Sequence, residues 1–331
     1  MSSILHVGLG PLGQRIIDDL YQRGLGRVIA AVDTAEHMRG RAVSEIAQGC
    51  SDPVPIVSSL DEVDAWSAID CAVVTTSSDL AVCAPTFRAL LARGCAVVST
   101  CEELAFPWLR HGQLARELDA LAIETGGKLL GTGVNPGYLM DAFALATTTV
   151  CREVRAITVH RVQDATPRRL PFQRKIGVGS SLEEFARRMD DGSLRHVGLG
   201  ESQHFLAHYL GLELDRWSED IEPVIADTPL SSGLGPVAAG DARGVRQIAR
   251  GYSGGALAIE LVFHAAIGEP DPHDRVVVDG DPPIDLTWKG GVHGDIATSS
   301  IVLNSIRSLR AAAPGLHTMA TLPLQGRAPR A

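Results

Sequence analysis

The sequence predicts an α/β protein in which a doubly wound parallel sheet is followed by an α+β domain with a mainly antiparallel sheet. Three observations predict this fold. The chain opens on a strand, a glycine-rich turn and a helix; six near-continuous apolar strands then alternate with helices to about residue 135; the strands after that alternate apolar and polar residues. With 331 residues, the chain suits two domains. We expect one over 1–136, joined by a C-terminal helix over 295–325, and one over 137–294.

The first domain begins with a motif that suits a dinucleotide. Residues 4–7 form an apolar strand, residues 8–13 (Gly-Leu-Gly-Pro-Leu-Gly) read G-x-G-x-x-G, and residues 14–20 have a helical pattern. The first glycine allows a tight turn, the second lets the backbone approach the phosphates, and the third lets the helix pack on the strand. The helix N-terminus adds N–H groups and a positive dipole. The predicted cofactor contacts here are Gly8, Gly10, Pro11, Leu12 and Gly13; the alternative is a glycine-rich turn in another α/β fold.

The second strand indicates which dinucleotide is bound. Residues 28–32 are apolar and end on Asp33, 20 residues after Gly13. A carboxylate there binds the adenosine ribose of NAD and would repel the 2′-phosphate of NADP. Arg39 and Arg41 follow and could accept that phosphate, or lie on a solvated helix face. The sequence therefore favours NAD, or NADH, slightly and leaves NADP open.

The remainder of the first domain keeps the same alternation. We predict helices over 41–48, 60–66, 80–93 and 108–124, and strands over 55–57, 69–74, 95–98 and 128–134. Ser59 with Glu62 has the spacing of a capping box. In parallel sheets, ligands bind beyond the carboxyl ends of the strands. The polar residues there are further predicted cofactor contacts, together with Arg39: Thr75, Thr76, Ser77, Thr100 and Asn135.

Two adjacent carboxylates follow the fifth strand. Glu102 and Glu103 lie in the segment 99–104 (Ser-Thr-Cys-Glu-Glu-Leu), where a nicotinamide ring would come close. One of them could act as a general base or hold an ammonium group. The alternative is that both simply begin the next helix, where acidic residues suit the helix dipole.

The pattern changes after residue 137. We predict a helix over 138–151 and a last helix over 295–312, with a disordered tail after about Pro323. We also predict a hairpin through 252–255 and strands over 154–163, 245–252, 256–265 and 275–279.

Three segments of this region have both a functional and a structural interpretation. Segment 131–137 is a hinge at a ligand cleft or a plain linker. The basic residues at 160–161 and 168–175 could bind a carboxylate or lie in solvent. His293 could belong to a site, or Asp295 could only cap the last helix.

Composition excludes several classes of function. The formal net charge is −9, and the arginines are dispersed, so we expect no nucleic-acid or membrane partner. No apolar run approaches the ~18 residues of a membrane span, and the first strand leaves no room for a signal peptide. The six cysteines form no C-x-x-C pair, which favours reduced thiols in a cytoplasmic protein without a metal site. Neither G-x-S-x-G nor H-E-x-x-H occurs.

Several segments together resemble the 2,4-diaminopentanoate dehydrogenase family, which includes the native amine dehydrogenases. The resemblance covers about residues 4–310 and is carried by segments 8–13, 99–104, 131–141, 171–177 and 294–298. It implies the dihydrodipicolinate reductase-like fold, a Rossmann domain plus a mixed α/β domain. The lysine-bearing double-histidine motif of true dihydrodipicolinate reductases is missing.

The resemblance also implies an activity. It is NAD(P)-dependent oxidative deamination of a primary amine, or reductive amination of a ketone or aldehyde with ammonia. Glu103, with Glu102 as the less favoured choice, would engage the substrate nitrogen. Further substrate contacts would come from Tyr138, Met140, Ala144, Arg161, Arg168, Gln173 and His293.

Three alternatives stay open. The protein could be 2,4-diaminopentanoate dehydrogenase proper, another oxidoreductase of this fold acting on C=N or C–OH bonds, or a dinucleotide-sensing protein without turnover. We also expect a homodimer, because an open antiparallel sheet face favours a partner.

Overall fold

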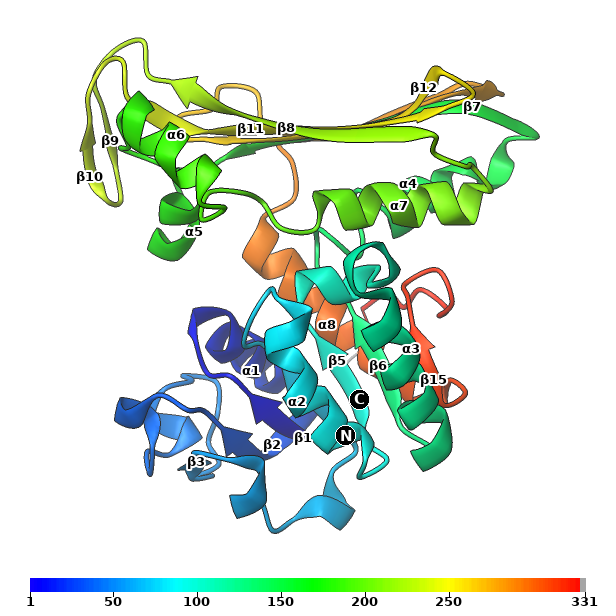
Figure 1. Cartoon of the computed structure of the whole chain (residues 1–331). Helices are drawn as coiled ribbons and strands as arrows, with labels where there is room; N and C mark the ends of the chain where they lie inside the picture. The colour runs from blue at the N-terminus through cyan, green and yellow to red at the C-terminus, as the bar shows by residue number, and fades with distance from the viewer. Residues whose placement is uncertain (328–331) are drawn as a thin grey trace. The chain divides into compact units, whose positions relative to one another are not determined.

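The computed structural model describes residues 1–327, shown in Figure 1. The chain divides into two compact units: unit 1 holds residues 1–138 and the C-terminal segment from His293, and unit 2 holds residues 139–292. Of the predicted disordered tail, residues 324–327 contain no helix or strand, and residues 328–331 lie outside the described residues.

Unit 1 is built on a parallel sheet of seven strands, as the sequence predicts for this domain. The strand order is β15 (Gly315–His317), β6 (Lys128–Gly131), β5 (Ala96–Ser99), β4 (Cys71–Val74), β1 (Ser2–Val7), β2 (Gly26–Val32) and β3 (Ile56–Val57). Its long helices are α1 (Pro11–Gln22), α2 (Leu80–Leu91), α3 (Trp108–Thr125) and α8 (Gly294–Ala311). The short strand β15 was not predicted.

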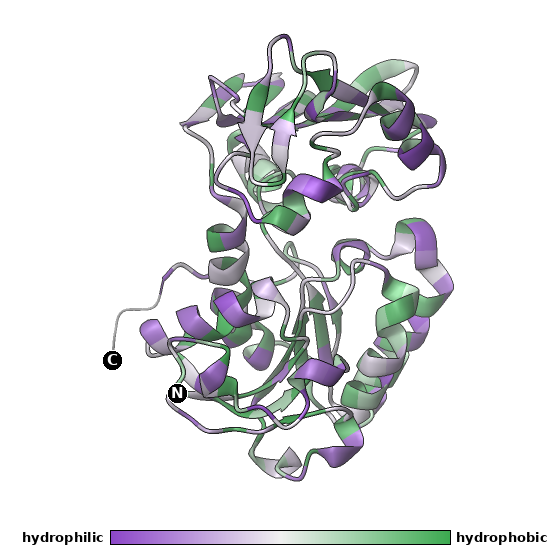
Figure 2. Ribbon diagram, turned by 90° about the vertical axis from the view of Figure 1, so that its left-hand side faces the viewer, coloured by the Kyte–Doolittle hydropathy of each residue, from purple (hydrophilic) through white to green (hydrophobic). Residues whose placement is uncertain are grey.

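The central strands form the core of unit 1. All residues of β4 and β5 are buried, and the strands of this sheet are coloured mainly hydrophobic in Figure 2. Burial on both faces is the reason why these segments read as continuous apolar runs. The carboxyl ends of β1, β4, β5 and β6 lie at one edge of the sheet, so the loops that follow these strands gather there.

Two predicted helices of unit 1 are wrong. Segment 41–48 holds only the 3₁₀ turn η2 (Val43–Glu45), because its backbone is tied to 54–56: Val43 N–H donates to Val54 O and Ile56 N–H to Arg41 O. Segment 60–66 forms η3 (Leu60–Glu62), and the backbone leaves the helical region at Val63; η4 (Trp66–Ala68) follows. Ser59 caps η3, but its Oγ atom accepts from Asp61 N–H rather than from Glu62 N–H, so the reciprocal capping box is incomplete.

Unit 2 carries a six-stranded, mainly antiparallel sheet, also as predicted. Its order is β14 (Ile284–Lys289), β13 (His273–Asp281), β7 (Glu153–Asp164), β12 (Ala256–Ala266), β11 (Ala242–Ser253) and β8 (Arg216–Ile225), and only β7 and β12 pair in parallel. The predicted hairpin joins β11 to β12 through Gly254 and Gly255, which both have positive φ. A two-stranded ribbon, β9 (Leu230–Ser232) and β10 (Gly235–Val237), was not predicted.

The helices of unit 2 differ most from the predictions. The expected helix 138–151 is only α4 (Ala142–Thr147) with the 3₁₀ turn η6 (Thr148–Val150), because Asp141 caps it at Ala142 N–H. Three helices were missed: α5 (Leu170–Lys175), α6 (Leu182–Asp190) and α7 (Leu199–Leu210). In Figure 1 the helices of this unit lie on one face of its sheet. The homodimer expected from the other face stays a prediction.

Two further observations concern the chain as a whole. Within residues 1–327, no helix combines the length and apolar character that a membrane crossing requires. All six cysteines are free thiols, and five of them are buried.

Candidate active site

The glycine loop of unit 1 has the geometry that its sequence motif requires. Gly8 has φ +91°, and a Cβ atom on Gly13 would lie 2.2 Å from Gly8 O, so α1 can pack against β1 only if residue 13 is glycine. A Cβ on Gly10 would meet no atom within 4 Å. Gly10 precedes α1 without a side-chain cap, Pro11 begins the helix, and the first turn holds no acidic residue. The helix N-terminus therefore suits an anionic ligand.

Asp33 is connected directly to this loop. Its Oδ2 atom accepts a hydrogen bond of 2.6 Å from Leu9 N–H, and its Oδ1 atom accepts one of 2.8 Å from Ala35 N–H. These two bonds fix the carboxylate beside the glycine loop. Arg39 and Arg41, the alternative 2′-phosphate ligands, pair instead with Glu62 at 3.8 Å and Glu45 at 3.4 Å.

The loop after β4 completes the same edge of the sheet. Thr75 Oγ1 donates to Gly8 O at 2.7 Å, so this loop and the glycine loop are linked. Thr76 Oγ1 lies 3.5 Å from Cys83 Sγ, and Ser77 Oγ accepts from Asp79 N–H at 3.2 Å. Thr100 N–H donates to Val74 O, which joins the β5 end to the β4 end. The predicted cofactor contacts of these loops thus lie along one edge, and their contact with a cofactor stays a prediction.

Glu103 is the buried carboxylate of this edge. It lies with Glu102 in the 3₁₀ turn η5 (Glu102–Ala105), and only 8% of its side chain is exposed. Its Oε2 atom accepts a hydrogen bond of 2.9 Å from Leu80 N–H, the first residue of α2. The carboxylate therefore lies at the N-terminus of α2, a different helix from the one that follows it in sequence. Glu102 is only half-buried.

His111, which the sequence analysis missed, contacts the same carboxylate. Its Nε2 atom lies 2.9 Å from Glu103 Oε2. It stands near the start of α3 with φ −129° and ψ 40°, a non-helical conformation that kinks the helix at this residue. The signal that could have revealed it is a histidine in the first turn of the helix that directly follows the candidate base.

Arg161, one of the two predicted arginine ligands of unit 2, is closed into a buried ion pair. Its guanidinium is 1% exposed, donates to Asp274 Oδ1 at 3.2 Å and to Val292 O at 3.2 Å. Burial lowers the pKa of Arg161 to about 10 and raises the pKa of Asp274, so desolvation outweighs the attraction between the two charges.

The basic segment 168–175 is not the solvated loop that was one alternative. Arg168 is buried, donates to Gln163 Oε1 at 2.6 Å, and lies over the ring of Phe172 at 4.0 Å. The Gln173 amide donates to the carbonyls of 165, 166 and 168 and accepts from Gly233 N–H at 3.0 Å. The bonds of Gln173 hold the segment to the β9–β10 ribbon, and the contact of Arg168 and Gln173 with substrate stays a prediction.

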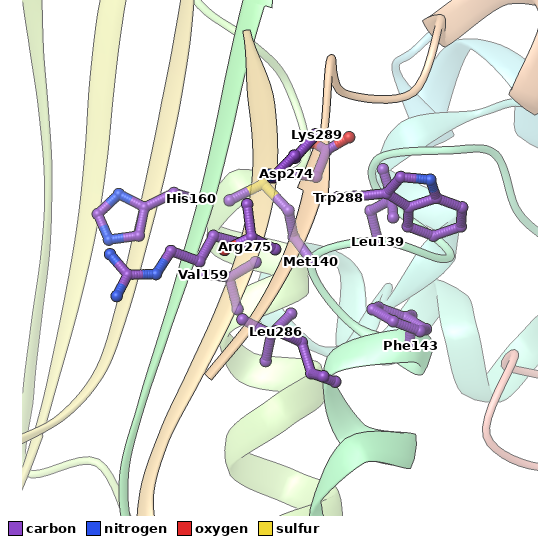
Figure 3. Close-up of a pocket in the computed structure, with 12 residues that line it drawn as sticks. Leu139, Met140, Phe143, Val159, His160, Asp274, Arg275, Leu286, Trp288 and Lys289 are labelled. Carbon is purple, nitrogen blue, oxygen red and sulfur yellow. The ribbon is translucent and has the colours of Figure 1, made fainter. Parts of the chain in front are cut away.

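Unit 2 contains an apolar cavity of about 460 Å³ beside the start of α4. Figure 3 shows the predicted substrate residue Met140 with Phe143 and Trp288 on one side, while His160 and Arg275 point away from them. The Phe143 and Trp288 rings are 5.8 Å apart. The lining residues are Leu139, Met140, Phe143, Val159, His160, Asp274, Arg275, Val276, Leu286, Thr287, Trp288 and Lys289.

The other predicted substrate residues are distributed over both units. Ala144 is fully buried in α4 and does not line this cavity. Tyr138 is half-buried, and burial raises its pKa. His293 is exposed and is itself the residue that precedes α8, so Asp295 lies in the first turn of the helix and not at its cap. Asn135 is buried in the segment that leaves β6.

Comparison with known proteins gives several matches. A family model described as the 2,4-diaminopentanoate dehydrogenase C-terminal domain matches residues 138–328. The 2,4-diaminopentanoate dehydrogenase of Acetoanaerobium sticklandii is 31% identical over 330 residues, which cover 97% of this chain and 93% of that protein.

Two solved structures share the fold. The amine dehydrogenase from Mycobacterium smegmatis is 22% identical, with a TM-score of 0.82 over 98% of this chain and 97% of its own. The WlbA dehydrogenase from Bordetella pertussis, solved with NADH and UDP-GlcNAcA, is 15% identical, with a TM-score of 0.51 over 95% of this chain and 89% of its own.

These matches confirm the resemblance read from the sequence. The family model covers more than half of the chain, and the curated relative matches nearly its full length. The chain belongs to the 2,4-diaminopentanoate dehydrogenase family of oxidoreductases.

Proposed function

We propose that this protein is an NAD(P)-dependent amine dehydrogenase, which oxidises a primary amine to a ketone or aldehyde and ammonia and runs the reverse amination. The observation that carries the proposal is Glu103, a buried carboxylate held by Leu80 N–H and His111 at the sheet edge that also bears the glycine loop. The relative from Acetoanaerobium sticklandii supports the same class of reaction.

A nicotinamide dinucleotide fits the residues of unit 1. The open space over Gly10 leaves room for a pyrophosphate, and the uncapped first turn of α1 offers it N–H groups. Asp33 lies where it would accept the ribose hydroxyls and repel a 2′-phosphate, and Arg39 is paired with Glu62, so we propose NAD rather than NADP. When bound, the cofactor would accept a hydride from the amine-bearing carbon.

Glu103 is the proposed general base. An amine in water at neutral pH is an ammonium ion, and the nitrogen must lose a proton before its lone pair can assist loss of hydride from carbon. Glu103 would take that proton and then help a water molecule to attack the resulting iminium carbon. A positioned base of this kind contributes ~10²–10⁴-fold to the rate.

The substrate that suits these residues is an amine with an apolar chain. The cavity of unit 2 lined by Met140, Phe143 and Trp288 has the size and the apolar lining that suit such a chain, since cavities of ~300–1,000 Å³ accommodate small ligands. Arg161 is neutralised by Asp274, which argues against its use for a substrate carboxylate. A second candidate, 2,4-diaminopentanoate, is favoured by the named activity of the curated relative.

A matched set of substrates tests the proposal. Reduction of NAD⁺ and NADP⁺ is followed with aliphatic primary amines, with 2,4-diaminopentanoate, and with the alcohols of the same carbon skeletons. We expect reduction of NAD⁺ with amines and none with alcohols. Reduction with the alcohols alone would contradict the proposal, and strong preference for the diamino acid would select the second candidate.

We also propose that the protein is a homodimer formed through the sheet face of unit 2 that bears no helices in Figure 1. Partly exposed Val162 and Val277 lie on that face. Light scattering during gel filtration should give twice the chain mass of 35.1 kDa. Substitution of both valines by lysine should give the monomer.

A further inference from the structure

The proposed reaction requires the base to exchange a proton with solvent. Oxidation of R₂CH–NH₃⁺ by NAD⁺ and water gives R₂C=O, NH₄⁺, NADH and one H⁺, so each turnover leaves one proton to be released. The carboxylate of Glu103 is only 8% exposed. If this buried group takes the proton of the amine, the proton must leave by a second group that reaches water.

His111 contacts the Glu103 carboxylate and is itself partly exposed to solvent. Its Nε2 atom lies 2.9 Å from Glu103 Oε2, and 25% of its side chain is exposed. It also lines a surface hollow of about 410 Å³ between α2 and α3, whose other lining residues include Ala84, Gly112 and Leu114. The imidazole therefore lies between the buried carboxylate and a hollow on the surface of unit 1.

The chain kinks at His111. Its φ of −129° and ψ of 40° break the helical path of α3, although its N–H still donates to Pro107 O at 2.8 Å. The contact with Glu103 is a hydrogen bond that the kinked conformation makes.

We propose, resting on the proposed function, that His111 positions Glu103 and carries its proton between the carboxylate and solvent. While Glu103 is ionised, the neutral imidazole carries its hydrogen on Nε2 and donates it to the carboxylate. Once Glu103 is protonated, exchange with water moves the imidazole hydrogen to Nδ1, and Nε2 accepts: the O–H bond of Glu103 breaks and an Nε2–H bond forms. The Nδ1–H bond then breaks, the proton passes to water in the hollow, and the starting Nε2–H tautomer is restored. Amination of a ketone runs the same steps in reverse.

The charged groups around the hollow are compatible with this transfer. Arg88 and Glu117 line it and pair with each other at 2.8 Å across α2 and α3. Arg110 lines it as well.

Two variants and a small-molecule probe test the proposal. His111→Gln keeps a hydrogen-bond donor near Glu103 but cannot transfer a proton, and His111→Ala removes both. In steady-state oxidation of a primary amine by the full chain, we expect kcat to fall roughly tenfold in both variants, a part of what a general base contributes. We expect KM for NAD⁺ to be unchanged, and added imidazole to restore kcat in a saturable way.

Three controls separate the possible outcomes. Imidazole should not change wild-type kcat or rescue Glu103→Gln, and His317→Gln, on β15 at the edge of the same sheet, should behave as wild type. Wild-type kcat and pH profile in His111→Gln would overturn the proton transfer, as would loss of activity that imidazole does not restore. Wild-type activity of Glu103→Gln would instead overturn the proposed base, so the two failures are distinguishable.

Discussion

Glu103 in unit 1 and Arg161 in unit 2 are both buried ionisable residues, and the sequence predicts both as site residues. Their surroundings differ in kind. Glu103 is held by a backbone N–H and an imidazole that is itself partly exposed, whereas Arg161 is held by the opposite charge of Asp274 and a carbonyl. A carboxylate held by neutral or titratable donors can still gain and lose a proton. A guanidinium closed on a buried carboxylate already has its charge neutralised by its own partner.

The largest effect is expected when the two carboxylates of η5, Glu103 and Glu102, are neutralised in separate variants. Glu103→Gln should lower kcat by ~10²–10⁴-fold, because the proposed base is lost while its shape is kept. NADH binding, followed by fluorescence, should be unchanged. Glu102→Gln is the matched control and should keep most of kcat; if the two results are exchanged, Glu102 is the base.

The Arg161–Asp274 pair should show the opposite behaviour, with a loss of stability. Arg161→Met leaves a buried carboxylate without its partner and should lower the free energy of unfolding by ~3–5 kcal/mol in urea titrations. Replacing both residues, Arg161→Met with Asp274→Leu, should recover most of this loss, because the charges are already costly to bury. A double variant as unstable as the single one would show that the pair contributes net attraction.

A third buried group, His6 of β1, extends the comparison to pH. Burial lowers its pKa to about 4 from 6.5, so the unfolded chain binds a proton that the folded chain does not between these values. Stability should therefore fall as the pH drops from 6.5 to 4, by on the order of 3 kcal/mol from this residue. The midpoint of urea unfolding, measured at a series of pH values from 7 to 4, checks this prediction. His6→Gln should reduce the dependence of stability on pH. An equal dependence in His6→Gln would assign it to other groups.

The smallest effect is expected at Gly10. Gly10→Ala adds a methyl group to open space at the mouth of the glycine loop, so the melting temperature should stay within a few degrees of wild type. NADH affinity should fall roughly tenfold, about 1.4 kcal/mol, because the methyl group occupies the space proposed for the pyrophosphate. Unchanged affinity would place the cofactor elsewhere.

The parts that the sequence predicted well are those where one local rule dominates. Continuous apolar strands and the three loop glycines specify the parallel sheet, and Gly13 fits only because Gly8 O lies so close. The predicted helix 41–48 failed because backbone pairing to residues 54–56 overrode local propensity, and the predicted helix 60–66 ended at Val63 after one 3₁₀ turn. The contact between His111 and Glu103 could not be derived, since it depends on a helix kink that no sequence period encodes.

The partners of Arg161 and Gln173 could not be derived from the sequence either, because they also depend on contacts made only in the folded chain. Residue type shows that Arg161 can bind a carboxylate but not which one, and the structure supplies Asp274, 113 positions away in the chain. Residue type likewise marks Gln173 as a candidate ligand, but it does not show that its amide joins three carbonyls and a glycine N–H. Family membership, in turn, makes the chain an oxidoreductase and removes the sensor without turnover from the alternatives.

The dependence of turnover on ammonium tests the central claim most directly. NADH consumption by the full chain is measured with an aliphatic ketone over a series of ammonium concentrations that begins at zero. The account predicts no consumption without ammonium, a saturable rise as ammonium is added, and a primary amine as product. Equal consumption without ammonium, with an alcohol as product, would contradict it.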